Sequence, residues 1–473
     1  MPDRTNRCPG CKLENCNGCG IFKKLNTNKH ARVLFPDKFQ AEPQEGLGIS
    51  FDVGTTSLAG MLWDLKDGTL LGVETGANPQ AVFGADVIRR IQAAVEDKES
   101  LEKMQGLLIN KLDQMAEQLF LAIKDENRGL DENIQKVTLA GNTAMSEILM
   151  GMQPDGLFSA PFCPDYERTV QMEGSRLGFR FLKDARILVL PPIGGYVGAD
   201  ALMVYSYVNL QEPDKKILAV DIGTNGEILL QCGSKRYACS AAAGPALEGG
   251  AVSQGMRAVS GAIDLVALSG RFPVQDIAVR VIGGAKPGGI CGSGLVDALA
   301  LLYQIGVLDS TGYMRSVEEA KKEGVPERIC KRIEEKDERR FLLTNASSPV
   351  YLTAGDVRQL QLSISAIRSG MEILLEKAEC RAEELDAVYL AGAFGCYIGI
   401  ESGIRIGIFP DVEKEKIIQA GNLAGTGAAM ALLSPKACQQ MEKEADQFTH
   451  VELALEGSFQ ELFLSHMNFP LQF

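Results

Sequence analysis

The chain has 473 residues, of which 45% are apolar, 23% are charged and 50 are glycines. This length exceeds what one hydrophobic core usually fills, so about three domains are expected. The net charge of −13, without a basic stripe, argues against a nucleic-acid partner. No stretch approaches 18 consecutive apolar residues and the N-terminus lacks an apolar signal core, so we expect a cytoplasmic protein without a membrane span.

Four cysteines crowd the first twenty residues, in the stretch CPGCKLENCNGCG: Cys8, Cys11, Cys16 and Cys19. A reducing compartment disfavours disulfides, so this cluster predicts metal ligands. A compact [4Fe-4S] cluster is the favoured interpretation; a [2Fe-2S] cluster and a structural Zn²⁺ are the alternatives, and only the first two could pass electrons. Residues 1–46, which end in the polar stretch DKFQAEPQEG, are predicted to form this metal-binding segment and a linker.

From residue 47 the pattern predicts strand, turn, strand. The stretches LGISF, LAGMLWDL and GTLLGVET read as a β-meander. An amphipathic helix with apolar residues at three- and four-residue steps follows between Leu101 and Ile123, and VTLA at 137–140 predicts a strand. A second long amphipathic helix is predicted at about 354–379.

An internal repeat indicates the architecture. FDVGTTSLAGML at 51–62 and VDIGTNGEILLQ at 220–231 share the order apolar, Asp, β-branched, Gly, Thr, polar. Repetition of one supersecondary unit at this separation predicts two similar α/β domains, 47–212 and 213–473.

The repeated Asp-x-Gly-Thr turn suits the binding of a phosphate tail. An aspartate at a strand end, here Asp52 and Asp221, can hold a hydrated Mg²⁺, while glycine admits the phosphate and threonine donates hydrogen bonds. The predicted phosphate-binding residues are Gly54, Thr55, Thr56, Gly223, Thr224 and Asn225. Glu227 and Glu248 are candidates to orient an attacking water; ordinary hairpin carboxylates are the alternative.

With these turns the chain resembles the superfamily of acetate and sugar kinases, heat-shock chaperones and actin. GNTAM at 141–145 and GNLAGTGAAMAL at 421–432 resemble its two connecting elements, and LAGAFG at 390–395 resembles its adenosine-binding turn. The resemblance implies two actin-like (RNase H-like) domains with ATP and Mg²⁺ in the cleft between them. It adds these candidates: Asn142, Gly392, Ala393, Phe394 and Gly395.

A narrower resemblance is to the ATP-dependent reductive activators of corrinoid proteins. It adds PPIGGYVGADAL at 191–202, SAAAGPALEGG at 240–250 and ICGSGLVDAL at 290–299. The resemblance implies an ATPase that passes one electron from an Fe-S cluster to the Co(II) corrinoid of a partner methyltransferase protein and restores Co(I). It also implies a low-potential donor such as ferredoxin or flavodoxin, and a homodimer. Gly292 and Ser293 begin a predicted helix that would suit an anion or be an ordinary cap.

The chain departs from many such activators at its N-terminus, where the cysteine cluster stands in place of a plant-type ferredoxin domain. Two other functions therefore stay open. One is a small-molecule kinase of the acetate and sugar kinase class with a structural zinc knuckle. The other is a nucleotide-dependent binding protein whose conformation is the output.

Overall fold

The structure is a computed structural model that describes residues 35–84, 86–124, 133–395 and 397–471, without the side chains of Ala393 and Phe394. The predicted metal ligands Cys8, Cys11, Cys16 and Cys19 lie outside the described residues. Within the described ranges, no helix is both long and apolar enough to cross a bilayer.

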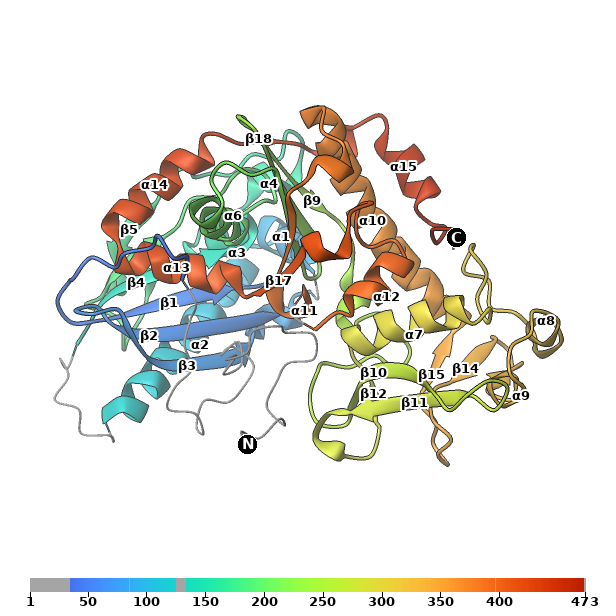
Figure 1. Cartoon of the computed structure of the whole chain (residues 1–473). Helices are drawn as coiled ribbons and strands as arrows, with labels where there is room; N and C mark the ends of the chain where they lie inside the picture. The colour runs from blue at the N-terminus through green and yellow to red at the C-terminus, as the bar shows by residue number, and fades with distance from the viewer. Residues whose placement is uncertain (1–34, 85, 125–132, 396, 472–473) are drawn as a thin grey trace. The chain divides into compact units, whose positions relative to one another are not determined.

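The first sheet has the strand order β3-β2-β1-β4-β6-β5 (Figure 1). Strands β1, β2 and β3 are the predicted antiparallel meander, whereas β1 pairs with β4 in parallel, so the sheet is mixed. The strands are β1 (Leu47–Val53), β2 (Ser57–Asp64), β3 (Thr69–Ala77), β4 (Ile134–Gly141), β5 (Val170–Glu173) and β6 (Arg186–Val189).

The alternation of side chains along β1 decides which residues face which layer. Leu47, Ile49, Phe51 and Val53 belong to the core on the side of α2 (Lys98–Lys124). Asp52 therefore points to the opposite face, which α13 (Leu423–Leu433) covers. Figure 1 shows α13 on one side of strands β1–β3 and α2 on the other.

The two long helices confirm the predicted periodicity. Helix α2 buries Leu101, Met104 and Leu108 on its sheet side, and α10 (Ala354–Ala378) buries its predicted apolar stripe. The remaining helices are α1 (Val87–Glu96), α3 (Thr143–Leu149), α4 (Asp155–Phe158), α5 (Gly174–Leu177), α6 (Ala199–Gln211), α7 (Gly292–Gln304), α8 (Val317–Lys322), α9 (Glu327–Cys330), α11 (Gly392–Gly395), α12 (Ile400–Arg405), α14 (Pro435–Ala445) and α15 (Phe459–Ser465).

A second six-stranded sheet has the order β17-β16-β7-β8-β9-β18, and two three-stranded sheets have the orders β11-β10-β12 and β13-β14-β15. These strands are β7 (Ile217–Ile222), β8 (Gly226–Cys232), β9 (Lys235–Ala241), β10 (Ala262–Ser269), β11 (Asp276–Val281), β12 (Gly289–Ile290), β13 (Ile333–Glu334), β14 (Arg340–Leu342), β15 (Tyr351–Thr353), β16 (Ala387–Ala391), β17 (Ile417–Gly421) and β18 (Thr449–His450). The fold class is α/β, as predicted.

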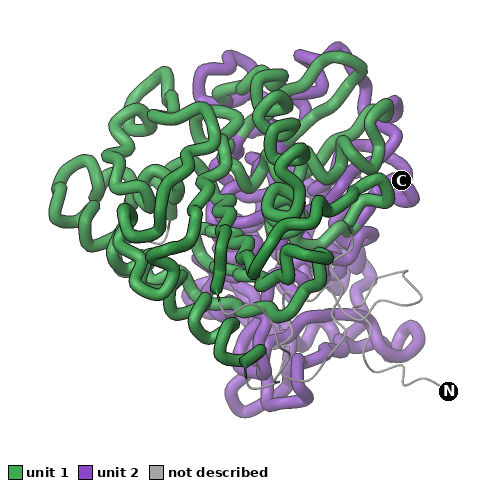
Figure 2. Tube along the Cα trace, turned by 90° about the vertical axis from the view of Figure 1, so that its left-hand side faces the viewer, with its two compact units in different colours: residues 1–221, 229–239, 419–452 green, residues 222–228, 240–418, 453–473 purple. Residues whose placement is uncertain are grey.

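The chain divides into two compact units, coloured separately in Figure 2. Unit 1 comprises residues 1–221, 229–239 and 419–452; unit 2 comprises 222–228, 240–418 and 453–473. Segment 419–452, far along the chain, thus returns to the N-terminal unit. This return places α13 beside β1 and β4.

Candidate functional site

The first predicted phosphate turn is closed by short-range hydrogen bonds after β1. The Gly54 N–H donates to the Ser57 carbonyl over 3.0 Å. A Cβ on Gly54 would lie 2.7 Å from that same oxygen, so the turn requires glycine. From the side, Asn78 Nδ2 donates to the Gly54 carbonyl over 2.9 Å. These two hydrogen bonds fix the backbone at Gly54 within the Asp52-Thr55 loop.

The structure brings the predicted residue Asn142 onto this loop. Asn142 caps α3, its Oδ1 accepting from the Met145 N–H over 2.9 Å. The Asn142 Nδ2 donates to Thr55 Oγ1 over 2.8 Å. The close approach of the two strand ends requires Gly141, where a Cβ would lie 2.7 Å from the Val53 carbonyl. Two of the predicted motifs thus form one site in unit 1.

A second asparagine, Asn422, completes the loop from the far end of the chain. It caps α13 through a 2.6 Å hydrogen bond that its Oδ1 accepts from the Gly425 N–H. Its Nδ2 donates to Asp52 Oδ2 over 2.7 Å. The sequence predicts a connecting element at 421–432 but does not by itself single out Asn422. The signal that could have found it is the pattern Gly-Asn-x-Ala, which occurs at 141–144 and again at 421–424.

Asp200, in the first turn of α6, is another site residue that the sequence interpretation missed. Helix α6 begins against the Asn142 loop: a Cβ on Gly198 would lie 2.3 Å from Asn142 Cα. Two residues on, the Asp200 carboxylate lies close enough to Asp52 for their charges to interact. The sequence signal for it is the acidic residue that ends the glycine-rich stretch GGYVGAD, at residues 194–200, where a helix starts.

Burial disfavours the ionised form of both carboxyl groups. It raises the pKa of Asp52 to about 6, against the opposing hydrogen bond from Asn422. It also raises the pKa of Asp200, and the neighbouring charge of Asp52 adds to that rise. Carboxyl groups in this situation are stabilised in their charged form by a cation placed between them.

The donor set fits a magnesium ion that carries nucleotide phosphates. Mg²⁺ prefers oxygen ligands, keeps several waters and typically uses one or two carboxylates together with phosphate. Asp52 and Asp200 supply two carboxylates, and the Asn142–Thr55 pair supplies neutral donors beside them. Within the described ranges, no group of three or more His, Cys, Asp or Glu side chains could hold a metal ion. Water and phosphate would therefore supply the remaining ligands.

The second predicted turn, whose residues 223–225 lie in unit 2, is joined to a predicted glutamate by a hydrogen bond. The Gly223 N–H donates to the Asn225 carbonyl over 2.9 Å, and Thr224 Oγ1 donates to Glu248 Oε2 over 2.8 Å. Burial raises the pKa of Glu248 despite this hydrogen bond. Asp221 stands near the end of β7. The structure thus pairs Thr224 with Glu248.

Glu227 has a different neighbour, because its Oε1 accepts from Ser240 Oγ over 3.4 Å. At the start of α7, the Ser293 hydroxyl donates to the Asp264 carbonyl over 2.9 Å. The Ser293 hydroxyl is thus engaged by the protein backbone, which is compatible with the prediction of an ordinary cap. Helix α7 nevertheless packs against the 3₁₀ turn η4 (Pro245–Glu248) that carries Glu248.

The predicted adenosine turn follows β16 as α11. Gly392 has a φ of +76°, a left-handed conformation that glycine adopts without strain. A Cβ on Gly395 would approach the Leu390 backbone to 3.1 Å, so the turn folds closely onto the strand. The two glycines thus let α11 pack closely against β16.

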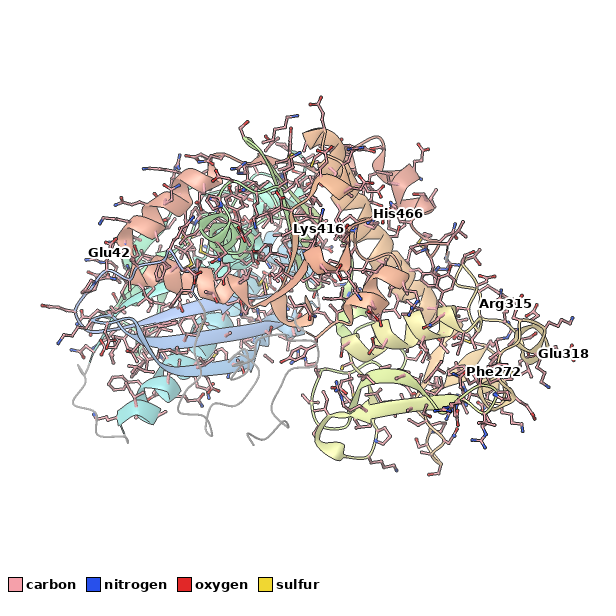
Figure 3. The ribbon with its side chains drawn as sticks, in the orientation of Figure 1. Glu42, Phe272, Arg315, Glu318, Lys416 and His466 are labelled. Atoms are coloured by element: carbon pink, nitrogen blue, oxygen red, sulfur yellow. The ribbon has the colours of Figure 1, made fainter. Side chains whose placement is uncertain are left out.

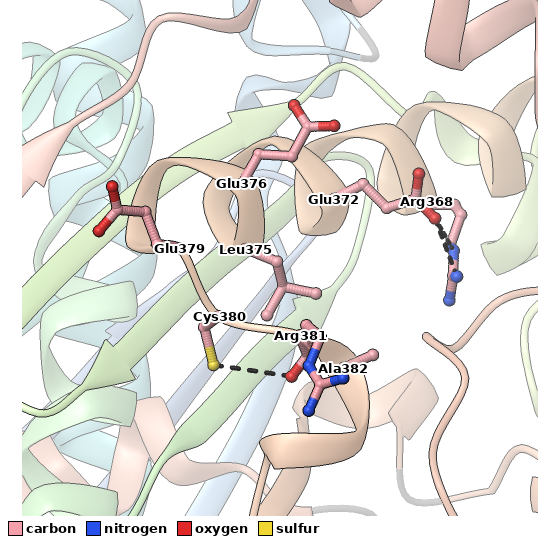
Figure 4. Close-up of a pocket in the computed structure, with 8 residues that line it drawn as sticks. All are labelled: Arg368, Glu372, Leu375, Glu376, Glu379, Cys380, Arg381 and Ala382. Carbon is pink, nitrogen blue, oxygen red and sulfur yellow. Dashed lines mark hydrogen bonds and ion pairs between the residues drawn. The ribbon is translucent and has the colours of Figure 1, made fainter.

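A separate cavity of about 380 Å³ lies in unit 2 at the C-terminal end of α10. Arg368, Glu372 and Cys380 are among its lining residues, and Figure 4 shows the Arg368–Glu372 pair. Arg368 Nη2 lies 2.9 Å from Glu372 Oε1. None of the lining residues is a predicted site residue, so this cavity is distinct from the predicted nucleotide site.

Comparison with known proteins agrees with this architecture. Residues 47–213 match the RACo middle region, and residues 215–472 match the C-terminal domain of RACo, the ASKHA domain. The chain is 33% identical over 427 residues to the corrinoid activation enzyme RamQ of Eubacterium limosum, covering 89% of this chain and 70% of that protein. It is 25% identical over 448 residues to the [Co(II) methylated amine-specific corrinoid protein] reductase of Methanosarcina barkeri, covering 90% and 77%.

Among solved structures, a reductive activator for corrinoid,iron-sulfur protein superposes with a TM-score of 0.78 at 31% identity. The match covers 91% of this chain and 67% of that one. The two matched regions are contiguous apart from residue 214 and span nearly all of the chain after residue 46. The chain belongs to the RACo family of reductive activators of corrinoid proteins, and its C-terminal part is an ASKHA domain.

Proposed function

We propose that this protein uses Mg-ATP to drive one electron from an Fe-S cluster to the Co(II) corrinoid of a partner methyltransferase protein. The observation that carries the proposal is the Asp52 site, in a chain of this family. Four loops meet there: the Asp52 turn, the Asn142 and Asn422 helix caps and the start of α6 with Asp200. Such a gathering of buried carboxylates and amides suits a magnesium-bound phosphate.

In this proposal the chain's own residues divide the work. Asp52 and Asp221, from the two repeated turns, position Mg²⁺ and the phosphates of one nucleotide, mainly through bound waters. Glu248 orients the water that attacks the terminal phosphate. Its hydrogen bond with Thr224, which places its carboxylate beside the second turn, supports this role. Glu227 is the alternative. The backbone at 392–395 lines the adenine.

The four cysteines are proposed to hold the cluster, most simply as [4Fe-4S]. Cys8, Cys11, Cys16 and Cys19 would hold the cluster, which would supply one electron for the reduction of Co(II) to Co(I) and would be re-reduced by a low-potential donor such as ferredoxin or flavodoxin. We also propose that the active form is a homodimer. A zinc ion at these cysteines could not take part in this step.

Nucleotide binding can supply a bias of the required size. Moving a two-state equilibrium from 1:99 to 99:1 takes about 5.5 kcal/mol. For a one-electron couple, ~59 mV corresponds to a tenfold change, so this bias equals roughly 0.24 V. A conformational change coupled to the nucleotide is therefore large enough to make an unfavourable reduction proceed.

The test is anaerobic reduction of a Co(II) corrinoid protein by the reduced full chain, followed by visible absorption of Co(I). We expect Co(I) to accumulate with Mg-ATP and to stay near background without it. A non-hydrolysable analogue distinguishes hydrolysis from binding as the source of the bias. The same Co(I) yield with and without nucleotide would contradict the proposal and favour the kinase alternative, which predicts ADP formation that depends on a small-molecule acceptor.

A further inference from the structure

Residues 35–46, here called the strap, lead from the cysteine segment into β1. We infer that the strap is a fixed anchor of that segment on unit 1, and that α13 links the anchor to Asp52. The meaning of this link for electron delivery rests on the proposed function. The anchor itself is a property of the protein without any ligand.

The strap is anchored first by apolar packing. The Phe35 ring lies 4.7 Å from that of Phe39 and 5.6 Å from that of Trp63, centroid to centroid. Trp63 is only 1% exposed. Both phenylalanines pack on a buried cluster formed by β2, the residue that follows it and the C-terminal half of α13: Met61, Trp63, Leu65, Ala429, Leu432 and Leu433. Removing this cover would expose apolar surface to water.

The strap also caps α13. The last carbonyls of a helix have no partner within it and need one elsewhere. The Glu42 N–H donates to the Leu433 carbonyl over 2.9 Å, and Gln44 Nε2 donates to the Leu432 carbonyl over 3.0 Å. Ser434 Oγ, just beyond the helix, donates to Glu42 Oε1 over 3.0 Å. Glu42 is labelled in Figure 3.

Helix α13 reaches from this cap to the candidate nucleotide site. Its 11 residues are all buried and span about 16 Å. At the N-terminus of α13, Asn422 donates a hydrogen bond to Asp52. At its C-terminus, the strap donates hydrogen bonds to the last carbonyls of the helix. A rigid helix in a close-packed interior moves as one body, so a shift at Asp52 is transmitted to the strap.

The anchor shortens the reach of the cysteines. Cys19 is 16 residues from Phe35 and 28 residues from Leu47. At about 3.5 Å per residue, a chain held at Phe35 extends at most about 56 Å, against about 98 Å for one held at Leu47. The effective concentration of the cysteine segment around its attachment point falls roughly as the −3/2 power of the tether length. Release of the strap would therefore lower this concentration about two- to threefold.

Trp63 contacts both the strap and strand β1, which carries Asp52. It is the only tryptophan in the chain. Its ring lies 5.6 Å from that of Phe35, centroid to centroid, and its Nε1 donates to Ser50 Oγ over 3.0 Å. Ser50 precedes Asp52 by two residues on the same face of β1. Tryptophan emission therefore measures strap docking directly.

The first test is the full-length double variant Phe35→Ser/Phe39→Ser. We expect a red-shifted Trp63 emission, stronger acrylamide quenching, ATP turnover within about twofold of wild type, and Co(I) formation slowed about two- to threefold. Phe158→Ser is the matched control, because this phenylalanine is 52% exposed and lies on α4 of the same unit. Wild-type emission and quenching in the double variant would overturn the anchor.

The second test concerns the link and needs neither nucleotide nor cobalt. Asn422→Ala removes the cap bond and the bond to Asp52, so hydrogen exchange of the Glu42 amide should speed up at the other end of α13. Asn142→Ala is the control, because it removes the equivalent cap of α3 and should leave the Glu42 amide unchanged. Equal exchange in both variants would overturn the link. Because these readouts are independent of cobalt reduction, their failure is distinguishable from failure of the proposed function.

Discussion

Asp52→Asn is expected to lower ATP turnover at least about 100-fold in a protein that still folds. The amide keeps an acceptor for Asn422 Nδ2 but loses the charge that would hold Mg²⁺ beside Asp200. Burial raises the pKa of Asp52 above its value in an unfolded chain. Its ionisation above pH 6 therefore costs folding free energy, and the variant should be at least as stable as wild type at pH 8. Steady-state phosphate release and a thermal melt measure the two effects.

The control for this prediction is Asp64→Asn. Asp64 ends β2 and its Oδ1 accepts from the Lys66 N–H over 2.9 Å, so it is a hairpin aspartate without a place in the candidate site. Its replacement should leave turnover within about twofold of wild type. Undiminished turnover in Asp52→Asn would mean that the phosphate site has been assigned to the wrong turn.

Cys16→Ser is expected to abolish cobalt reduction while ATP turnover persists. Loss of one of four thiolates removes or destabilises an Fe-S cluster, and with it the only proposed carrier of the electron. The anaerobically purified wild-type protein should be brown and bleach on reduction; the variant should be pale and contain less iron. Iron content, visible absorption and Co(I) yield are measured on the same preparations.

Cys163→Ser is the matched control for the cysteine prediction, because Cys163 is an exposed free cysteine outside the N-terminal cluster. It should keep the colour and the Co(I) yield of wild type. A colourless wild-type protein with bound zinc, or full cobalt reduction by Cys16→Ser, would remove the redox role from the cysteine segment and leave the ATPase assignment untouched.

Elements with strict periodicity were predictable from the sequence. Helix α10 buries its whole predicted stripe, and the predicted meander forms as β1-β2-β3, with strand ends within two residues of the predicted stretches. Helix α2 shows the limit of the pattern, because Leu107 sits at an apolar position yet is 37% exposed. Periodicity specifies a face, whereas the edge of that face depends on the partner that covers it.

The composition of the candidate site depended on contacts that no local pattern encodes. Asp52 and Asn422 are 370 residues apart in the chain. Asp200 lies near enough to Asp52 for their charges to interact, at the start of a helix that Gly198 allows to approach Asn142. The docking of the strap on unit 1 was equally unpredictable from the sequence. Its polar composition predicts a linker, but its backbone and the Gln44 amide satisfy the open end of α13. Such helix caps depend on the tertiary fold.

We propose that the two repeated turns bind one nucleotide. Isothermal titration of the full chain with Mg-bound, non-hydrolysable ATP analogue tests it most directly, in wild type, Asp52→Asn and Asp221→Asn. We expect one nucleotide per chain for wild type and at least about tenfold weaker binding, a change of about 1.4 kcal/mol, in each single variant. Two independent nucleotides per chain, or unchanged affinity in either variant, would contradict it.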